Sequence, residues 1–275
     1  MNDNFCPAPK FEKIVLGADA CEFCEGATRE AVNIAKNCGS KLYAVAVVEV
    51  NPEFESLAPK AVEDIEREVH GYLESVKRQA IKDGVDFEII AHRGEEAADH
   101  IVAEARRVGA DVIILGRRGR KGIKRLLMGS VTANVIGRSP CSVLVVPRLA
   151  KVAFKNIVAA TDGSAQGDAA AREAIAIARK MGAKLSLIAA ERPVAGGFAE
   201  LSHLVEAAKG QGVQAQTANP AGRPFEAIAN YAKEAGADLV VIGSRGRTAL
   251  QKLLMGSVAE RVVGLSPCAV LVVKG

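Results

Sequence analysis

Two segments of the chain match each other: Phe11-Glu12-Lys13-Ile14-Val15-Leu16-Gly17-Ala18-Asp19 and Phe154-Lys155-Asn156-Ile157-Val158-Ala159-Ala160-Thr161-Asp162. Each is a short apolar run that ends on an aspartate, which is typical of a buried strand. Further matches follow in the same order along the chain, as far as Ser139-Pro140-Cys141 and Ser266-Pro267-Cys268. Matches that continue in order along the whole chain indicate two tandem copies of one domain.

The length of 275 residues suits two domains of ordinary size. We place them at residues 1–150 and 151–275, joined by a short connection near Arg148–Ala153. The first copy is longer around residues 51–82, where we expect a longer helix. A short connection between similar domains favours a packed two-domain unit.

Each copy alternates short apolar runs with Ala-rich segments of helical spacing, such as Ala27–Asn37 and Ala169–Lys180. Gly39 and Gly182 follow these two segments, where a helix C-cap is expected. This alternation predicts an α/β fold with a parallel sheet and helices on both faces. The predicted strands are Lys13–Asp19, Lys41–Val48, Asp86–Ala91, Asp111–Leu115, Ser142–Val146, Asn156–Asp162, Lys184–Ala190, Val213–Thr217, Asp238–Ile242 and Ala269–Val273.

The composition excludes several classes of protein. Hydrophobic residues make up 49% and charged residues 25%, which indicates a globular rather than a disordered chain. No apolar run reaches the roughly 18–20 residues that a membrane span needs. The N-terminus has no signal-peptide pattern, so we expect a cytoplasmic protein whose cysteines are mostly reduced. A net charge of +4 is too small to indicate nucleic-acid binding.

A glycine-spaced loop follows the fourth predicted strand of each copy. It reads Gly116-Arg117-Arg118-Gly119 and later Gly129-Ser130 in the first copy, and Gly243-Ser244-Arg245-Gly246 and later Gly256-Ser257 in the second. Glycine permits positive φ and a close approach of the backbone to a ligand. We expect the last Gly-Ser to open a helix, with the serine as N-cap or phosphate donor. Because helix N-termini bind phosphate, the pattern predicts an anion site in each copy.

With this spacing the chain resembles the universal stress protein family, in its tandem-domain form and its ATP-binding subclass. The resemblance covers essentially the whole chain. It implies an adenine nucleotide alpha hydrolase-like fold, with a five-stranded sheet of order 3-2-1-4-5 in each copy, and ATP or ADP bound between the first and fourth strands. Mg²⁺ or Mn²⁺ is expected on the phosphates. The implied contact residues are Asp19, Val47, Gly116, Gly119, Gly129, Ser130 and Val131, and in the second copy Asp162, Ala190, Gly243, Gly246, Gly256, Ser257 and Val258.

The two copies differ at the end of their first strand. The second has Asp162-Gly163-Ser164, the usual turn of the family, whereas the first has Asp19-Ala20-Cys21. Alanine is unfavourable if this turn needs positive φ, which would alter the geometry of the first site.

Cys21 and Cys24 form a C-x-x-C motif directly after the first predicted strand. Near a helix N-terminus, such a pair is a redox pair or half a metal site. Cys6 and Cys38 are candidates for further ligands, and the alternative is that all these cysteines are incidental. The Lys- and Arg-rich run Arg117–Arg125 similarly reads either as a phosphate clamp or as a solvated loop.

These patterns favour a nucleotide-dependent regulatory or stress-response protein. No catalytic motif is present, so we expect weak ATP hydrolysis at most. The alternatives are a slow ATPase or phosphotransferase, and a thiol or metal sensor that uses Cys21 and Cys24. The resemblance implies a homodimer, or an intramolecular pseudo-dimer of the two domains, through the last strands Ser142–Val146 and Ala269–Val273. We also expect an unknown regulatory partner protein and no membrane contact.

Overall fold

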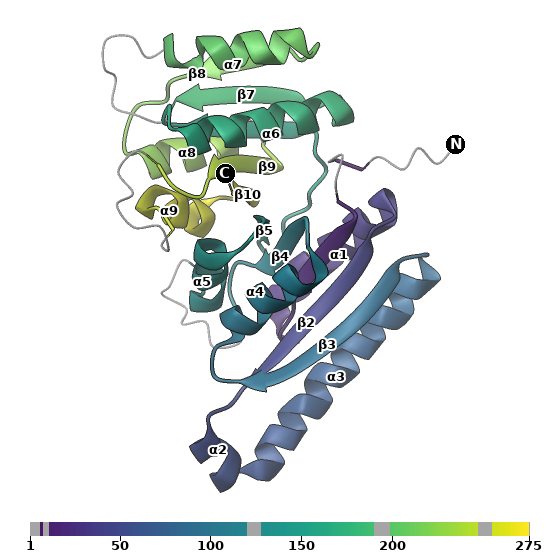
Figure 1. Cartoon of the computed structure of the whole chain (residues 1–275). Coiled ribbons are helices and arrows are strands. Elements are labelled where there is room, and N and C mark those ends of the chain that lie inside the picture. The colour runs from purple at the N-terminus through teal and green to yellow at the C-terminus, as the bar shows by residue number, and fades with distance from the viewer. Residues whose placement is uncertain (1–5, 8–10, 120–127, 190–198, 247–254, 275) are drawn as a thin grey trace.

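A computed structural model describes the chain except for residues 1–5, 8–10, 120–127, 190–198, 247–254 and 275 (Figure 1). Every predicted strand is present, with ends shifted by a few residues. The strands are β1 Lys13–Gly17, β2 Lys41–Glu49, β3 Asp86–Gly94, β4 Val112–Gly116, β5 Ser142–Val146, β6 Asn156–Thr161, β7 Lys184–Ala189, β8 Ala215–Ala218, β9 Leu239–Gly243 and β10 Ala269–Val273.

Helices follow the strands in both copies. They are the 3₁₀ helix η1 Glu22–Cys24 and the α-helices α1 Glu25–Cys38, α2 Pro52–Leu57, α3 Pro59–Lys82, α4 Ala97–Val108, α5 Ser130–Arg138, α6 Ala165–Met181, α7 Ala199–Gly210, α8 Pro224–Glu234 and α9 Ser257–Leu265. The long α3 confirms the helix expected in the longer first copy. Gly39 and Gly182 end α1 and α6 with φ of 65° and 60°, so the predicted glycine caps are confirmed.

The strands form one ten-stranded sheet of order β3-β2-β1-β4-β5-β10-β9-β6-β7-β8. Each copy thus has the expected order 3-2-1-4-5, and all strand pairs within a copy are parallel. The two last strands, β5 and β10, pair with each other in antiparallel orientation. The predicted sheets of the two copies are therefore continuous with each other.

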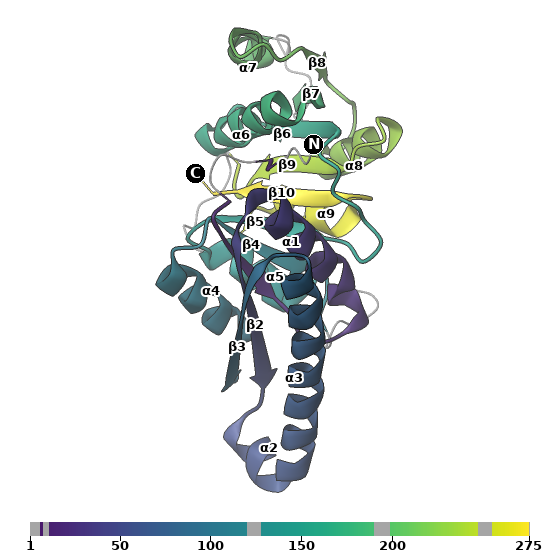
Figure 2. The ribbon, with the colours of Figure 1, turned by 90° about the vertical axis from the view of Figure 1, so that its right-hand side faces the viewer.

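Alternation along the strands divides the core into two layers. On β1, Ile14 and Leu16 face a layer under α1, α3, α6 and α7, whereas Val15 faces a layer under α4, α5, α8 and α9. Figure 2 shows α3 and α4 on opposite sides of β2 and β3. Because both faces are covered, the central strands β4, β9 and β10 are apolar throughout, as parallel strands buried on both sides require.

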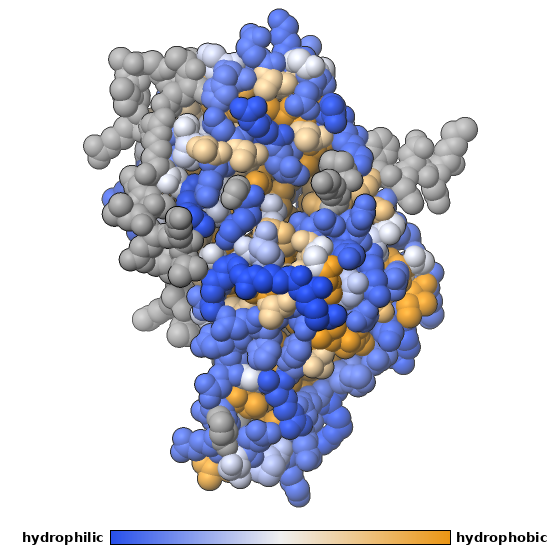
Figure 3. Space-filling view, viewed as in Figure 1, coloured by the Kyte–Doolittle hydropathy of each residue, from blue (hydrophilic) through white to orange (hydrophobic). Residues whose placement is uncertain are grey.

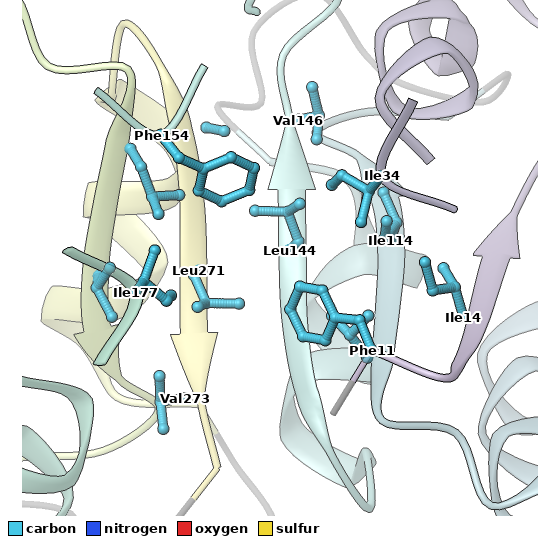
Figure 4. Close-up of a cluster of buried hydrophobic side chains, with 14 of the residues drawn as sticks. Phe11, Ile14, Ile34, Ile114, Leu144, Val146, Phe154, Ile177, Leu271 and Val273 are labelled. Atoms are coloured by element: carbon cyan, nitrogen blue, oxygen red, sulfur yellow. The ribbon is translucent and has the colours of Figure 1, made fainter. Parts of the chain in front are cut away.

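The two copies meet along β5 and β10. Leu144 on β5 stands opposite Leu271 on β10, and Phe154, from the segment between the copies, packs into the same buried cluster (Figure 4). Hydrophilic side chains cover most of the face in Figure 3, with hydrophobic ones in small groups between them. None of the described helices combines the length and apolarity that a membrane crossing needs.

Cys6 and Cys38 are joined in a disulfide bond that ties the N-terminal segment to the end of α1. The expectation that these two cysteines could serve as further metal ligands is therefore wrong. Cys21, Cys24, Cys141 and Cys268 are free thiols.

Candidate functional site

A cavity of about 310 Å³ lies at the carboxyl ends of β1, β2 and β4 in the first copy. Ligand sites of open α/β sheets occur at this edge, where the strand order reverses. The walls of the cavity come from β2, α3, α4 and the start of α5. All the first-copy residues of the predicted site line it, namely Asp19, Val47, Gly116, Gly119, Gly129, Ser130 and Val131.

Asp19 and Asp162 occupy equivalent turns at the ends of β1 and β6. Their Oδ1 atoms accept hydrogen bonds from the backbone N–H groups of Cys21 at 3.2 Å and Ser164 at 3.0 Å. This local bond is the usual way in which an aspartate stabilises a turn. The bond fixes each carboxylate at the edge of the sheet. The second carboxylate oxygen, Oδ2, then faces the glycine loop.

The turn does need positive φ. Ala20 has φ of 56°, and Gly163, at the same place in the second copy, has φ of 71°. The first copy therefore keeps the turn of the second with an alanine in the left-handed region, which is unfavourable for any residue with a Cβ atom. Ser164 accepts a hydrogen bond from the N–H of Gly167 and caps α6, whereas Cys21 makes no such cap before η1.

The loop glycines lie close to other atoms, but the predicted reason of positive φ is wrong, because none of them is among the described residues with positive φ. A Cβ atom on Gly119 would lie 2.8 Å from Asp19 Oδ2, and one on Gly246 would lie 2.3 Å from Asp162 Oδ2. A Cβ atom on Gly116 would similarly lie 2.8 Å from the carbonyl oxygen of Phe23. The glycines therefore bring the loop against the aspartate and against the segment after β1.

Each loop ends at the start of a helix. Gly129 and Gly256 are the N-caps of α5 and α9, so Ser130 and Ser257 are the first helical residues. Neither helix has a side-chain cap, and the predicted role of serine as N-cap is therefore wrong. The N–H groups of the first helical turn have no intrahelical partner, and in α5 they belong to cavity-lining residues.

Arg118 was named from the sequence only as one member of the basic run Arg117–Arg125 and was not distinguished from its neighbours. It lines the cavity, and its Nε atom is buried without a hydrogen-bond partner among the described residues. Arg245 takes the same position in the second glycine loop, a repetition that could have pointed to both. The neighbouring Arg117 instead donates from Nη1 to the carbonyl oxygens of Gly264 at 3.1 Å and Ser266 at 3.0 Å, at the end of α9.

The second copy brings the same kinds of residue together. Besides the contact of Gly246 with Asp162, the Cβ position of Gly256 lies 3.4 Å from Arg245 Cα, so the start of α9 meets the loop. The other predicted residues stand at the end of β9 and the start of α9: Gly243, Ser257 and Val258. Ala190 lies outside the described residues, as do residues 120–125 of the basic run.

The C-x-x-C motif lies beside Asp19. The ligand atoms of Asp19, Cys21 and Cys24 are all within 4.8 Å of one another. A hydrogen bond from Cys21 lowers the pKa of Cys24 to about 7, although burial of Cys24 opposes this effect. The same bond, together with burial, raises the pKa of Cys21. Of the two thiols, Cys24 is therefore the one that loses its proton readily.

Comparison with known proteins assigns the chain to a family. The model of the universal stress protein family matches residues 10–147 and 153–274. The chain belongs to the universal stress protein family. A universal stress protein of Methanocaldococcus jannaschii is 34% identical over 143 residues, which are 50% of this chain and 83% of that protein.

A solved structure agrees with this assignment at the level of the fold. A universal stress protein from Archaeoglobus fulgidus has a TM-score of 0.78 and 22% identity, over 96% of this chain and 99% of that chain. Another universal stress protein, solved in complex with cAMP, is 28% identical over 44% of this chain and 98% of that chain, with a TM-score of 0.39.

Proposed function

We propose that this universal stress protein is a nucleotide-dependent regulatory protein that binds ATP or ADP in the cavity of the first copy and at the corresponding place in the second. The observation that carries the proposal is the buried Nε atom of Arg118 in the wall of the cavity, a donor for which the described part of the chain offers no partner. Buried donors are almost always hydrogen-bonded, and a phosphate oxygen is the acceptor that arginine recognises best.

The other walls suit the remaining parts of a nucleotide. Asp19 offers carboxylate oxygens to ribose hydroxyl groups, and Val45 and Val47 offer an apolar surface to the base. The free N–H groups and the positive end of the dipole at the start of α5 favour phosphate. Mg²⁺ or Mn²⁺ would bind chiefly to the phosphates and water, because such ions need few protein ligands beside a nucleotide.

Regulation rather than turnover is the role that these residues favour. Arg118, Asp19 and the start of α5 can bind and orient a nucleotide, and we assign none of them to proton transfer. Occupancy would change the surface that a partner protein meets, with weak hydrolysis at most. The division at residue 150, a homodimer and a cytoplasmic location are further parts of this proposal.

Titration calorimetry with ATP, ADP and cAMP tests the proposal on four variants. Loss of a charge-assisted hydrogen bond costs about 1.5–3 kcal/mol, so Arg118→Ala should weaken one class of sites at least tenfold. Arg245→Ala should weaken the other class, and the double variant both. Arg117→Ala is the matched control, because this arginine contacts α9 and does not line the cavity. Equal affinities for wild type and Arg118→Ala would refute the proposed phosphate site.

A further inference from the structure

The cluster of Asp19, Cys21 and Cys24 has no part in the proposed nucleotide chemistry except through Asp19. We propose that these three side chains form a site for one thiophilic divalent cation, such as Zn²⁺, in the first copy. The inference goes beyond the proposed function and does not depend on it. Its basis is the convergence of two thiols and one carboxylate from a single turn.

The distances suit a tetrahedral metal. With Zn–S bonds of about 2.3 Å and Zn–O bonds of about 2.0 Å, ligand atoms on one zinc ion lie about 3.5–3.8 Å apart. The three ligand atoms here all lie within 4.8 Å of one another without a metal. Rotation of the side chains that moves the ligand atoms about 1 Å closer together would therefore close the site. The C-x-x-C spacing is the usual one for two thiolates on one zinc.

Neighbouring groups already hold the ligands in place. The N–H of Cys21 donates to Asp19 Oδ1 at 3.2 Å, and the thiol of Cys24 donates to the hydroxyl oxygen of Tyr72 at 3.7 Å. The bond to Asp19 is of the kind that orients a metal ligand, and Tyr72 stands where its hydroxyl group can donate to Cys24 once that thiol has lost its proton. On binding, both thiols release their protons to solvent, and the two thiolates and the carboxylate leave one net negative charge on the zinc complex.

The site would keep one coordination position open. Three protein ligands leave the fourth position of a tetrahedral zinc to water or to another ligand. Asp19 and Cys24 also line the cavity, so this position would face the space proposed for the nucleotide. The second copy has Ser164 and Gly167 where the first has Cys21 and Cys24, so we expect one metal ion per chain.

The test is metal uptake by the reduced full-length protein under anaerobic conditions and without nucleotide. After equilibration with Zn²⁺ and removal of the excess, wild type should retain one zinc per chain. Cys21→Ser should bind at least about tenfold more weakly, because even the loss of an outer hydrogen bond to a ligand has that effect. Cd²⁺ should give thiolate-to-metal charge-transfer absorption in wild type, and this absorption should fall in the variant.

Two controls separate this site from other sulfur atoms. Cys141→Ser removes a free thiol elsewhere, and the double variant Cys6→Ser/Cys38→Ser removes the thiols that reduction of the disulfide would release. Both should bind zinc as wild type does. No retained metal in wild type, or equal retention by Cys21→Ser, would overturn the inference. Nucleotide binding is measured separately, so either proposal can fail while the other stands.

Discussion

Replacing Ala20 with glycine should stabilise the protein, and replacing Gly163 with alanine should destabilise it. Both residues have positive φ, at 56° and 71°. A residue with a Cβ atom is disfavoured there by about 1–2 kcal/mol. The greater freedom of glycine in the unfolded chain offsets about 0.4–1 kcal/mol of this difference. The net effect of each substitution should therefore be about 1 kcal/mol, with opposite signs.

Thermal unfolding followed by circular dichroism measures the pair. For a chain of this size, about 1 kcal/mol corresponds to a shift of about 2–4 °C in the midpoint, upward for Ala20→Gly and downward for Gly163→Ala. Gly71→Ala is the control, because Gly71 lies inside α3 with nothing within 4 Å of its Cβ position. It should raise the midpoint, since alanine favours helix. A lower midpoint for Ala20→Gly would refute the explanation based on φ.

Three further predictions concern the loop and the cysteines. Gly246→Ala should cost about 1–3 kcal/mol in the free energy of unfolding, because its Cβ atom would lie 2.3 Å from Asp162 Oδ2 and displace the hydrogen-bonded carboxylate. Arg117→Ala should cost about 1–2 kcal/mol, because it removes two hydrogen bonds between the copies. In the metal-free protein, thiolate absorbance should rise with a midpoint near pH 7 as Cys24 ionises, and this midpoint should move to higher pH in Cys21→Ala.

Each of these has its own check. Gly256→Ala is the partner of the loop variant, since its Cβ atom would meet nothing closer than 3.4 Å, and equal effects of the two would contradict the clash. For Arg117, chemical denaturation midpoints equal to wild type would mean that its bonds to the end of α9 contribute nothing. For the thiols, an unchanged absorbance midpoint in the variant would show that Cys21 does not donate to Cys24.

The strands of each copy and the position of the site were predictable because they follow from local patterns, whereas the strand order came from the family resemblance. The internal repeat, the apolar strands and the glycine caps at Gly39 and Gly182 are all visible in the sequence. The loop glycines were also found, but for a partly wrong reason. Position 119 can require glycine because of a positive φ or because Asp19 lies too close for a Cβ atom. Which of the two applies depends on how two distant segments pack together, and the local sequence does not show this.

Other features depended on long-range packing in the same way. The bond between Cys6 and Cys38 joins residues separated by 32 positions, and no spacing rule pairs them. Arg118 and Arg117 are adjacent and chemically identical, yet one lines the cavity and the other reaches the second copy. The antiparallel pairing of β5 with β10 joins the two sheets, and the family resemblance indicated only that these strands were candidates for such contact.

The nucleotide content of the purified protein should be measured before any other property. The chain is denatured, and the released nucleotide is quantified by chromatography per mole of protein, before and after incubation with ATP. We predict bound adenine nucleotide, about two per chain if both copies bind it and about one if a single copy does. A chain that carries no nucleotide and takes up none from ATP would contradict the proposal, and the glycine loops would then serve the architecture of the fold alone.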